Sequence, residues 1–598
     1  MESATAPGAG TATKPVGIAD LMSRAAAQHG STDAVMFKDG AEWKTRSFAE
    51  VGEAVDGLAK GLMALGVEKG DKVSILANTR PEWSCFDFAA LSAGATVVPI
   101  YQTNSPEECQ YVLEDSDAKV VVVEDESQLA KVRSVRDTLP KLEHVVLMVG
   151  DAEDAISSIA LVDRGAVIDG AALRQRTDSV AGADICTIIY TSGTTGPPKG
   201  CVISHANYRA MVDMVVAEDV VKGGDLIYLF LPLAHSFAKL IQLGSYQQGS
   251  TIAYWSLDPK KIIDDVAEVR PTYLPSVPRI FEKIYTKATA AEGVKKALLT
   301  RSVATGRKVR ELERQGETPG FLLSLQYKLA DKLVLSKIRG LFGGRVRLCV
   351  TGAAPINQEI LEFFWAAGVL VLEGYGMTET STAATINRPD DFKFGTVGKP
   401  FPGVDVRIGD DGEILVGGPN VFQGYFKKDD ATGETLVDGW LHTGDLGEIA
   451  PDGFVRITGR KKDIIITAGG KNITPANFEG DMKQHALISQ CVMVGDRRPY
   501  LTALVTLDPE EAPEWAKAHD LSGDLASLTA SDEIRAELER HMDEVNRKYA
   551  KVEQVKKLAI LPHDLSQETG ELTPTMKVKR NVVVEKYDDE IEQLYAGS

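Results

Sequence analysis

The stretch YTSGTTGPPKG, residues 190–200, decides how the rest of the chain is interpreted. It follows the apolar run ADICTIIY (183–190), which is typical of a buried strand. Gly193 and Gly196 permit positive φ angles, so that successive backbone N–H groups can converge on an anion. The hydroxyl donors and the cation of the stretch are Thr191, Ser192, Thr194, Thr195 and Lys199. The stretch therefore predicts a loop that binds phosphate, and a plain surface turn is the alternative interpretation.

The spacing within this loop excludes a Walker-type P-loop. That motif requires a Gly, four further residues, then Gly, Lys and Ser or Thr. The fifth position after Gly193 is Pro198, and Lys199 is followed by Gly200. An ordinary kinase or ATPase loop is therefore excluded, whereas binding of phosphate is not.

Length and composition indicate a globular protein with more than one domain. The chain has 598 residues, of which 44% are hydrophobic and 25% charged, and its net charge is −19. Such an acidic chain is a poor match to nucleic-acid binding, which depends on Lys and Arg neutralising phosphates. The six cysteines are scattered without CxxC spacing, which argues against a zinc cluster and favours the reducing cytoplasm. Residues 1–16 are small and polar and are interpreted as a disordered lead.

Strand and helix patterns alternate along the first two thirds of the chain and predict an α/β fold. Short β-branched runs occur at 71–77, 96–101 and 118–124. Gly-rich short strands at 395–460 predict a small β-barrel or barrel-like sheet. A break near GRKKD (459–463) predicts an N-terminal domain of 17–459 and a C-terminal domain of 460–598, which is long enough to fold alone.

Residues 283–345 are predicted to be a helical insert of unusual charge. The segment carries 14 Lys and Arg against 5 Asp and Glu, a net of +9 in a chain of −19. One helical stripe is made of Leu322, Leu325, Leu329 and Leu333. The basic residues mostly off that stripe are Lys328, Lys332, Lys337 and Arg339. Two interpretations stay open: the helix packs on its own domain and leaves a solvated basic face, or it lies at a membrane surface.

Three further motifs offer groups suited to a nucleotide, and the first two of them follow strands. They are TGAAP (351–355), EGYGMTET (373–380) and LHTGDLG (441–447). Loops at the carboxyl ends of strands in an open α/β sheet line the ligand crevice, so these motifs are expected to meet. Tyr375 offers a flat face for a base, Glu379 an oxygen ligand for Mg²⁺ and Asp445 a carboxylate for ribose hydroxyls.

Together the motifs resemble those of the adenylate-forming (AMP-binding) acyl-CoA synthetases. YTSGTTGPPKG, TGAAP, EGYGMTET, LHTGD, GRKKDIIITAGGKNITPANFE and LTPTMKVKR stand in the order found in that family, and the resemblance covers about residues 17–590. LPLAHSFAK (231–239), PTYLPSVPRIFEKIY (271–285) and the insert are similar to its long-chain fatty acyl-CoA ligase branch of actinobacterial type. The resemblance implies a large N-terminal domain of two αβ layers plus a distorted β-barrel, and a small mobile α+β C-terminal domain.

The resemblance also implies a reaction in two steps. The carboxylate of a long-chain fatty acid attacks the α-phosphate of ATP and gives acyl-AMP and pyrophosphate, and the coenzyme A thiolate then gives acyl-CoA and AMP. Mg²⁺ is the implied metal, held by Thr191 and Glu379. The expected partners are the fatty acid, ATP and coenzyme A, with no nucleic acid. The expected location is the cytoplasm, with membrane contact through 283–345 and the oligomeric state left open.

By this resemblance the ATP- and AMP-binding residues fall into three groups. Those around the β- and γ-phosphates are Thr191, Ser192, Gly193, Thr194, Thr195, Gly196 and Lys199. Those around the adenine and the α-phosphate are Gly352, Ala353, Ala354, Pro355, Glu373, Gly374, Tyr375, Gly376 and Thr378. Those around the ribose are Asp445 and Arg460. The implied catalytic residues are Lys577, which also contacts the nucleotide, Thr378, Glu379 and His235.

The motif LTPTMKVKR supplies the lysine that is expected to reach the cleft in the first step. That lysine is Lys577, but Met576 stands where many members have Gly, which leaves Lys579 as the alternative. The resemblance implies that the C-terminal domain rotates about Lys462 between the two steps. The loop of Gly469, Gly470 and Lys471 would then face the cleft on the coenzyme A side.

Other interpretations remain for the acyl side of the site. His235 is either a neighbour of the acyl carboxylate or a packed, hydrogen-bonded histidine. The acyl pocket is expected to be long and apolar, with Tyr273, Pro275 and Val277 as candidates. The closest alternative function is a fatty acyl-AMP ligase that loads an acyl carrier protein. An ADP-forming phosphotransferase and a non-catalytic fatty-acid carrier are more remote.

Overall fold

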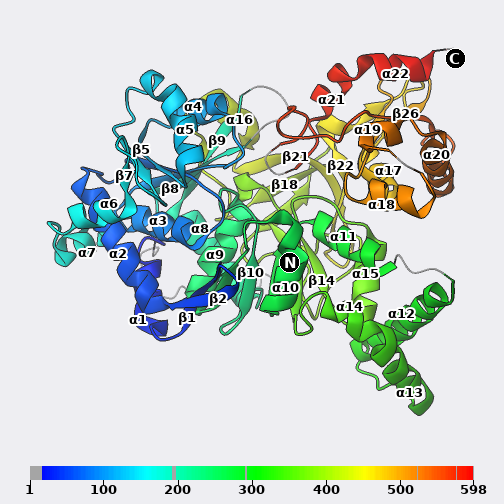
Figure 1. Ribbon diagram of the computed structural model, residues 1–598, viewed down its shortest axis with the longest axis horizontal. Coiled ribbons are helices and arrows are strands. Elements are labelled where there is room, and N and C mark those ends of the chain that lie inside the picture. Colours follow the sequence, from blue (N-terminus) through cyan, green and yellow to red (C-terminus); the bar gives the residue numbers. More distant parts are fainter. Residues whose placement is uncertain (1–16, 192–196, 290–292, 522, 574–575, 597–598) are drawn as a thin grey trace, which may run out of the picture.

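The computed structural model describes residues 17–191, 197–289, 293–521, 523–573 and 576–596. The predicted lead at 1–16 and the loop residues Ser192, Gly193, Thr194, Thr195 and Gly196 lie outside these ranges. Within the described ranges, no helix is both long enough and apolar enough to cross a membrane. Figure 1 shows the larger N-terminal part, and the smaller C-terminal part lies against its upper right side.

The first layer is an eight-stranded sheet in the order β19-β9-β8-β4-β3-β5-β6-β7. Its inner strands pair in parallel and are buried on both faces, which is why they are continuous β-branched runs. The strands are β3 (Lys72–Leu76), β4 (Thr96–Ile100), β5 (Ala118–Val123), β6 (His144–Leu147), β7 (Ile156–Ser157), β8 (Ile185–Thr191), β9 (Lys199–Ser204) and β19 (Gly424–Tyr425). The helices of this part are α2 (Phe48–Ala64), α3 (Pro81–Ser92), α4 (Pro106–Asp115), α5 (Glu126–Val135), α6 (Ser158–Gly165) and α7 (Gly170–Asp178).

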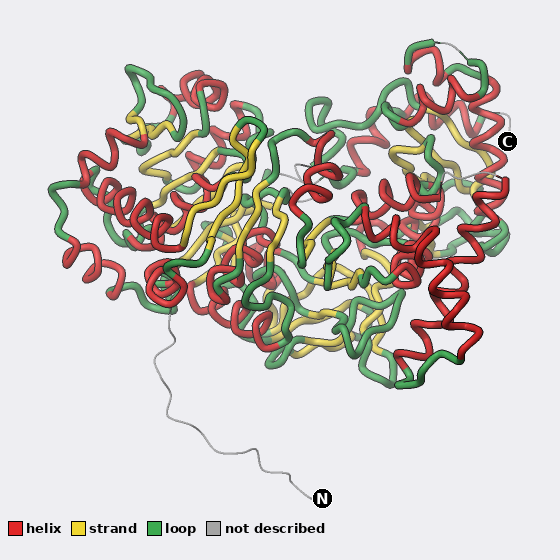
Figure 2. The backbone as a smooth tube through the Cα atoms, turned by 60° about the horizontal axis from the view of Figure 1, so that its bottom comes forward, coloured by secondary structure: helices red, strands yellow, loops and turns green. Residues whose placement is uncertain are grey.

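The second layer is a nine-stranded sheet in the order β16-β15-β14-β13-β12-β10-β11-β1-β2. Its strands are β1 (Asp33–Asp39), β2 (Glu42–Ser47), β10 (Leu226–Leu229), β11 (Thr251–Tyr254), β12 (Tyr273–Ser276), β13 (Leu348–Thr351), β14 (Val371–Tyr375), β15 (Thr385–Ile386) and β16 (Lys399–Pro400). Its helices are α1 (Leu21–His29), α8 (His205–Ala217), α9 (Ser236–Gln248), α10 (Ile262–Val269) and α15 (Gln358–Ala367). A fully buried ion pair between Lys239 of α9 and Asp87 of α3 (2.5 Å) joins the two layers. Figure 2 shows the strands inside and the helices around them.

The Gly-rich segment forms a five-stranded antiparallel sheet, with β18 between β17 and β21, and both β20 and β22 paired to β21. These strands are β17 (Asp405–Ile408), β18 (Glu413–Gly417), β20 (Leu436–Val437), β21 (Trp440–Ile449) and β22 (Val455–Arg460), with α16 (Asp429–Thr435) before β20. Among the described residues the pairings do not close into a ring. The sheet is therefore an open form of the barrel-like element expected for this segment.

The C-terminal part has hydrophobic cores of its own, because two clusters of buried residues are built only from residues after 464. Its strands are β23 (Ile465–Ile466), β24 (Asn472–Ile473), β25 (Ile488–Val494), β26 (Leu501–Leu507) and β27 (Val555–Ile560). Its helices are α17 (Pro475–Met482), α18 (Glu511–Ala518), α19 (Leu525–Thr529), α20 (Asp532–Asn546), α21 (Arg580–Lys586) and α22 (Asp588–Tyr595). The predicted α/β fold class, with a large N-terminal and a smaller C-terminal part, is confirmed, whereas the boundary at 459/460 stays a prediction.

The insert is helical and projects from the body of the molecule at the lower right of Figure 1. Its elements are α11 (Pro278–Thr289), α12 (Gly293–Arg314), α13 (Phe321–Ala330), a π-helical turn (Asp331–Leu335) and α14 (Ser336–Gly340). The leucine stripe is not the face that packs on the domain. Leu322, Leu325, Leu329 and Leu333 are all exposed, and other residues of the same helix make the packing contacts. Helical periodicity predicts that a stripe exists, but not which way it faces.

Candidate active site

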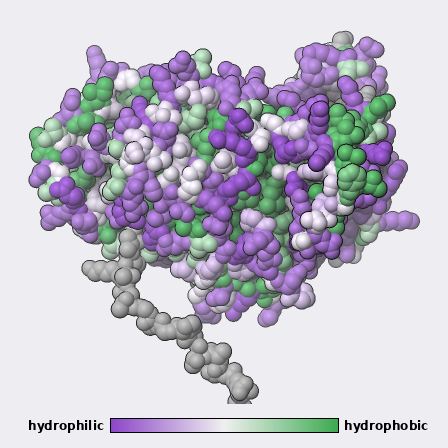
Figure 3. Space-filling view, turned by 90° about the horizontal axis from the view of Figure 1, so that it is seen from below, coloured by the Kyte–Doolittle hydropathy of each residue, from purple (hydrophilic) through white to green (hydrophobic). Residues whose placement is uncertain are grey.

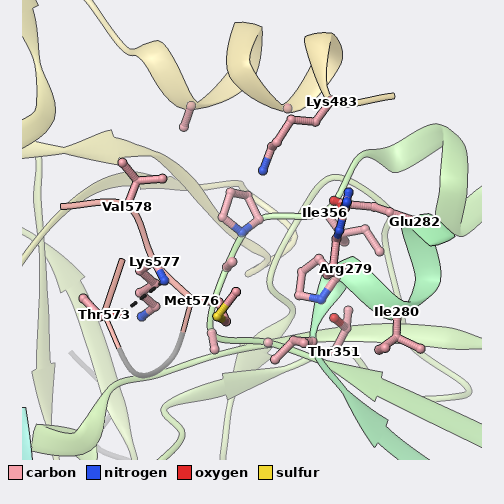
Figure 4. A pocket seen from close by; sticks show the side chains of 18 of the residues that line it. Arg279, Ile280, Glu282, Thr351, Ile356, Lys483, Thr573, Met576, Lys577 and Val578 are labelled. Atoms are coloured by element: carbon pink, nitrogen blue, oxygen red, sulfur yellow. Dashed lines mark hydrogen bonds and ion pairs between the residues drawn. The ribbon is translucent and has the colours of Figure 1, made fainter. Parts of the chain in front are cut away.

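One cavity of ≈ 2800 Å³ lies where both layers, the antiparallel sheet and the C-terminal part meet. Every predicted catalytic or nucleotide-binding residue that is described lines it: Thr191, Lys199, His235, Gly352, Ala353, Ala354, Pro355, Glu373, Gly374, Tyr375, Gly376, Thr378, Glu379, Asp445, Arg460 and Lys577. Figure 4 shows the region in which Lys577 and Met576 approach Thr351 and α11. Motifs that lie far apart in the sequence therefore line a single cavity.

The predicted phosphate loop closes a hairpin between β8 and β9. These strands pair antiparallel, and Thr191 and Lys199 are the last opposed pair before the loop. The Lys199 ammonium lies 4.9 Å from the centre of the Tyr425 ring. Both ends of the loop are thus held by a strand ladder, and its cation lies at the cavity wall.

Tyr375, Asp445 and Arg460 form a connected group on the cavity wall. The Tyr375 hydroxyl donates to Asp445 Oδ2 (2.9 Å), and Arg460 Nε lies 2.9 Å from Asp445 Oδ1. Asp445 lies within β21, and it stands opposite Arg460 of β22. The strand ladder therefore holds the carboxylate and the guanidinium side by side.

Glu379 and Thr378 lie in a single 3-10 turn just after β14, and both are buried. Glu379 Oε1 accepts a hydrogen bond from the Tyr425 hydroxyl (2.7 Å), which orients the carboxylate. The approach to this turn requires Gly376, because a Cβ there would lie 2.1 Å from the Thr382 carbonyl oxygen. We refer to Tyr375, Glu379, Tyr425, Asp445 and Arg460 as the nucleotide floor.

Glu373 also lines the cavity, at the position expected beside the adenine. Burial raises the pKa of its carboxyl to about 8, so that the protonated form is favoured at neutral pH. A neutral carboxyl can donate as well as accept a hydrogen bond, which a carboxylate cannot.

The donors near the predicted metal position are a carboxylate and a hydroxyl, from Glu379 and Thr191. Among the described residues there is no group of three or more His, Cys, Asp or Glu that could hold a metal alone. Mg²⁺ is commonly bound by one or two carboxylates together with nucleotide phosphates and water. This donor set fits a Mg²⁺ that arrives with a nucleotide, and it does not fit a resident protein-only metal centre.

His235 caps the N-terminus of α9. Its Nδ1 accepts a hydrogen bond from the Phe237 backbone N–H (3.2 Å), which leaves Nε2 as the proton-bearing nitrogen. Burial, and secondly the positive charge of Lys577, lower the pKa of His235 to about 4. The ring is therefore neutral near pH 7 and lines the cavity with one donor.

Lys577 enters the cavity from the C-terminal part on a tight turn. Its backbone N–H donates to the Thr573 hydroxyl (3.1 Å), and its carbonyl accepts from the Thr573 N–H (2.8 Å). Burial, and secondly Arg460, lower the pKa of the Lys577 ammonium to about 8. Met576 before it has φ +62°, in the region that favours glycine, which gives a physical reason for the Gly of other members. Lys579 also lines the cavity.

Among the residues that the structure describes, three polar contacts join α11 and the start of α15 to the C-terminal part near the cavity. Arg279 of α11 pairs with Asp508 (2.5 Å), and Lys283 of α11 pairs with Glu510 (2.9 Å). Asn357 Nδ2 donates to Asp481 Oδ1 (2.8 Å). We refer to these three as the cross-contacts, and they hold the C-terminal part with Lys577 in the cavity.

Of the residues predicted for the second step, Lys462 lines the cavity, whereas the loop of Gly469, Gly470 and Lys471 does not. Lys462 is exposed in a short 3-10 turn after β22, whereas its neighbour Lys461 is held by Asp411 and Glu413. Gly469, Gly470 and Lys471 are exposed in the turn between β23 and β24, and they are not among the residues that line the cavity. The structure therefore brings Lys577, and not this loop, to the nucleotide floor.

Sequence reasoning missed several residues that hold the site together. Tyr425 orients Glu379, and Glu413 accepts from the Gly444 N–H (2.7 Å), from His442 and from Lys461, which fixes the segment before Asp445. Asp508 forms an ion pair with Arg279. No local motif marks these residues, because each acts through a partner far away in the sequence.

Of the acyl-pocket candidates, Tyr273 and Val277 line the cavity and Pro275 does not. The apolar residues of this side are contributed by α8, α9 and β12. They include Val215, Leu240 and Ile241, which are buried. The apolar lining thus includes residues of α9, the helix that His235 caps.

Comparison with known proteins identifies the family. A model of the AMP-binding enzyme family matches residues 22–426, and a model of the AMP-binding enzyme C-terminal domain matches residues 462–598. This chain belongs to the AMP-binding enzyme family. The family recognised in the sequence is thereby confirmed, and the order of its motifs was the signal that carried it.

Relatives and solved structures agree with this membership. The chain is 40% identical over 559 residues, 92% of each chain, to the long-chain-fatty-acid–CoA ligase FadD15 of Mycobacterium bovis. It is 35% identical to the long-chain-fatty-acid–CoA ligase ACSBG2 of Xenopus laevis, over 97% of this chain and 84% of the relative. It superposes on ATP-bound MatB from Rhodopseudomonas palustris with a TM-score of 0.68 and 25% identity, over 96% of this chain and 99% of that one.

Proposed function

We propose that this protein is an AMP-forming long-chain fatty acid–CoA ligase. The observation that carries the proposal is that Lys577, the nucleotide floor, His235 and apolar residues of α8, α9 and β12 line one cavity. Relatives named long-chain-fatty-acid–CoA ligases that match over nine tenths of the chain support the substrate class.

In the first step a carboxylate oxygen of the fatty acid attacks the α-phosphorus of ATP, and the bond to pyrophosphate breaks. Lys577 lies where an ammonium can bridge the carboxylate and the α-phosphate, and Thr378 supplies a hydroxyl there. The neutral His235 donates from Nε2 to the incoming carboxylate. Donors placed in advance around developing charge are a dominant source of rate enhancement.

The nucleotide roles follow the geometry of the floor. Tyr375 presents its ring to the adenine, and Asp445 with Arg460 binds the ribose hydroxyls. The β- and γ-phosphates are assigned to the hairpin loop between Thr191 and Lys199. Glu379 and Thr191 would hold a Mg²⁺ that neutralises phosphate charge when it is bound.

In the second step the coenzyme A sulfur attacks the acyl carbonyl carbon, and AMP leaves with the bonding electrons. We propose that the C-terminal domain turns about Lys462 to withdraw Lys577, while Arg460 and Lys461 keep their contacts with the antiparallel sheet. The turn of Gly469, Gly470 and Lys471 would then reach the cavity, where side-chain-free backbone allows close passage of the coenzyme A arm. We place the enzyme in the cytoplasm, where its six buried free thiols stay reduced.

A single assay tests the proposal. The full chain is incubated with ATP, Mg²⁺, coenzyme A and fatty acids of graded length, and the nucleotide and thioester products are measured. AMP, pyrophosphate and acyl-CoA in equal amounts are expected. ADP as the product would contradict the adenylate chemistry. Acyl-AMP that accumulates with coenzyme A but is consumed by an acyl carrier protein would establish the fatty acyl-AMP ligase instead.

A further inference from the structure

The insert helix α13 is apolar on two opposite faces. One face packs on the domain through Ala330, Tyr327 and, within the π-helical turn, Val334 and Leu335. The opposite face presents large apolar side chains to solvent, and these are Phe321, Leu322, Leu325, Leu329 and Leu333. Phe321 is 82% exposed and Leu322 is 74% exposed. Large apolar side chains on a helix face are normally covered by other parts of the protein. The outer face of α13 is instead open to solvent.

The exposed residues form one contiguous strip rather than scattered positions. Their spacing of three or four residues places them on neighbouring turns of one helix face. Figure 3 views the molecule from below and shows a hydrophobic patch on the side where α12 and α13 project in Figure 1. Large exposed apolar patches on soluble proteins generally mark interaction sites. We refer to Phe321, Leu322, Leu325, Leu329 and Leu333 as the leucine strip.

Positive charge borders the leucine strip. Lys328, Lys332 and Lys337 are exposed on the same helix, at its edges. Two of the few acids of the insert, Glu313 and Asp331, are already paired with Arg310 and Arg339. The surface around the strip is thus basic in a chain whose net charge is −19. An apolar centre with lysines at its edges matches a bilayer interface, in which acyl chains lie below anionic headgroups.

The cavity of the active site extends to the base of the insert. Its lining includes Thr286, Lys287 and Thr289 at the end of α11 and Lys296 at the start of α12. The helices that carry the leucine strip therefore continue from the rim of the cavity that is to receive a fatty acid. A second copy of the chain is a poorer occupant, because a two-fold contact through the strip would bring the lysines of one copy against those of the other.

We propose that the leucine strip and its bordering lysines dock this enzyme on the surface of an anionic lipid bilayer, with the rim of the cavity facing the lipid. The purpose of this docking, the delivery of a fatty acid, rests on the proposed function. The flotation test of the docking does not depend on that function. The strip enters the headgroup region, and no segment crosses the bilayer.

Flotation of the full chain with vesicles tests the docking. Vesicles of phosphatidylcholine with phosphatidylglycerol are compared with vesicles of phosphatidylcholine alone, at low and at high salt. The variant Leu325→Asp/Leu329→Asp is expected to lower partitioning by at least about tenfold, because apolar insertion is lost. The variant Lys328→Glu/Lys332→Glu is expected to lower it by a similar factor on anionic vesicles only, and high salt is expected to remove that difference.

The matched control is Ile159→Asp/Val167→Asp, which places two acids at exposed apolar positions of another surface. Partitioning of this control like the wild type is expected, and an equal loss in all variants would show mere charge repulsion and overturn the proposal. The oligomeric state is measured alongside. If the wild type is a dimer that Leu325→Asp/Leu329→Asp converts to a monomer without any change in flotation, the strip is a contact between copies and the lipid proposal is wrong.

Activity separates docking from catalysis. With a short fatty acid dissolved in buffer, the leucine variant is expected to form acyl-CoA at the wild-type rate. With a long-chain acid dissolved in anionic vesicles, its rate is expected to fall about as much as its partitioning. If the wild type forms no acyl-CoA from any acid, dissolved or in vesicles, the proposed function is wrong, whereas flotation would still decide the docking.

Discussion

The nucleotide floor and the turn that carries Lys577 are positioned by different kinds of contact. The floor is built from adjacent strands of the N-terminal part and from buried hydrogen bonds such as Tyr375–Asp445 and Tyr425–Glu379. Lys577 comes from the other part and is held over the floor by three cross-contacts, two of which are ion pairs with partly exposed cations. The difference suggests, under the proposed function, that ATP would meet a floor already formed, whereas the position of the ammonium depends on contacts that can break and form again.

The largest effect is expected from substitution of Lys577. Lys577→Ala removes the ammonium from the attacking carboxylate and should slow acyl-AMP formation by about 10²–10⁴-fold. Acyl-CoA formation from supplied acyl-AMP should be nearly unchanged, because the floor is intact. Pyrophosphate release and thioester formation are measured separately. Lys579→Ala is the control, and a larger loss in that variant would move the role to Lys579.

On the floor side, Tyr425→Phe deletes the hydroxyl that donates to Glu379 and leaves the ring beneath Lys199. A hydrogen bond to a charged group contributes about 1.5–3 kcal/mol, so adenylation should fall roughly 10–100-fold. The Mg²⁺ concentration for half-maximal rate should rise, because the carboxylate is no longer oriented. Titration of the rate with Mg²⁺ measures this, and an unchanged Mg²⁺ dependence would dissociate Glu379 from the metal.

The pH profile of adenylation should report the environment of Lys577. Burial lowers the pKa of its ammonium to about 8, so the charged form is present below that pH and is lost as the pH rises through it. The rate should therefore fall about tenfold per pH unit well above pH 8. His235, whose pKa is lowered to about 4, stays neutral over this range and adds no second limb. In Lys577→Arg the falling limb should disappear, since a guanidinium stays charged.

A smaller effect is expected from the cross-contacts. Arg279→Glu places like charges opposite Asp508 and should slow acyl-AMP formation about five- to tenfold, while the second step keeps its rate. The added exchange Asp508→Arg should restore most of the loss, because the pair is rebuilt with reversed sign. Equal slowing of both steps would indicate damage to the fold instead of a shift between positions of the C-terminal domain.

The smallest effect concerns the turn before Lys577. Met576 has φ +62°, and a glycine there removes the steric cost of that conformation. Met576→Gly should stabilise the turn by about 0.5–1 kcal/mol, less the entropy that glycine adds to the unfolded chain. Slower amide hydrogen exchange at Lys577 would show this. Faster exchange would mean that the Met576 side chain, whose sulfur lies 3.4 Å from Gln567 Nε2, contributes more than its backbone costs.

The sequence predicted which residues form the floor better than it predicted how they are arranged. The motif order identified the family, and the strand runs predicted β3, β4 and β5 within one or two residues of their bounds. The motif supplied Asp445 but not its place in a strand, where its neighbours pair with β18 and β22 over a distance that no local pattern reports.

The contacts that hold the delivered lysine could not be predicted at all. Arg279 and Asp508 are 229 positions apart, and neither stands in a motif that marks its partner. The sequence also could not predict whether the leucine strip faces the core or the solvent, because the helical period of 3.6 residues is the same in both cases. Tertiary packing decides both the Arg279–Asp508 pairing and the direction of the leucine strip, and packing is known only from the three-dimensional structure.

Lys461 is held by ion pairs, whereas its neighbour Lys462 is exposed, and this difference has a kinetic consequence. Lys461 is anchored to Asp411 and Glu413 of the antiparallel sheet, so a rotation of the C-terminal domain has a fixed axis just beyond it. In the proposed rotation about such an axis, Lys577 and the turn of Gly470 would reach the cavity in alternation and not together. The two half-reactions are then mutually exclusive in time, and pyrophosphate should leave before coenzyme A binds productively. Initial-rate patterns of the ping-pong type are the signature of such a pivot.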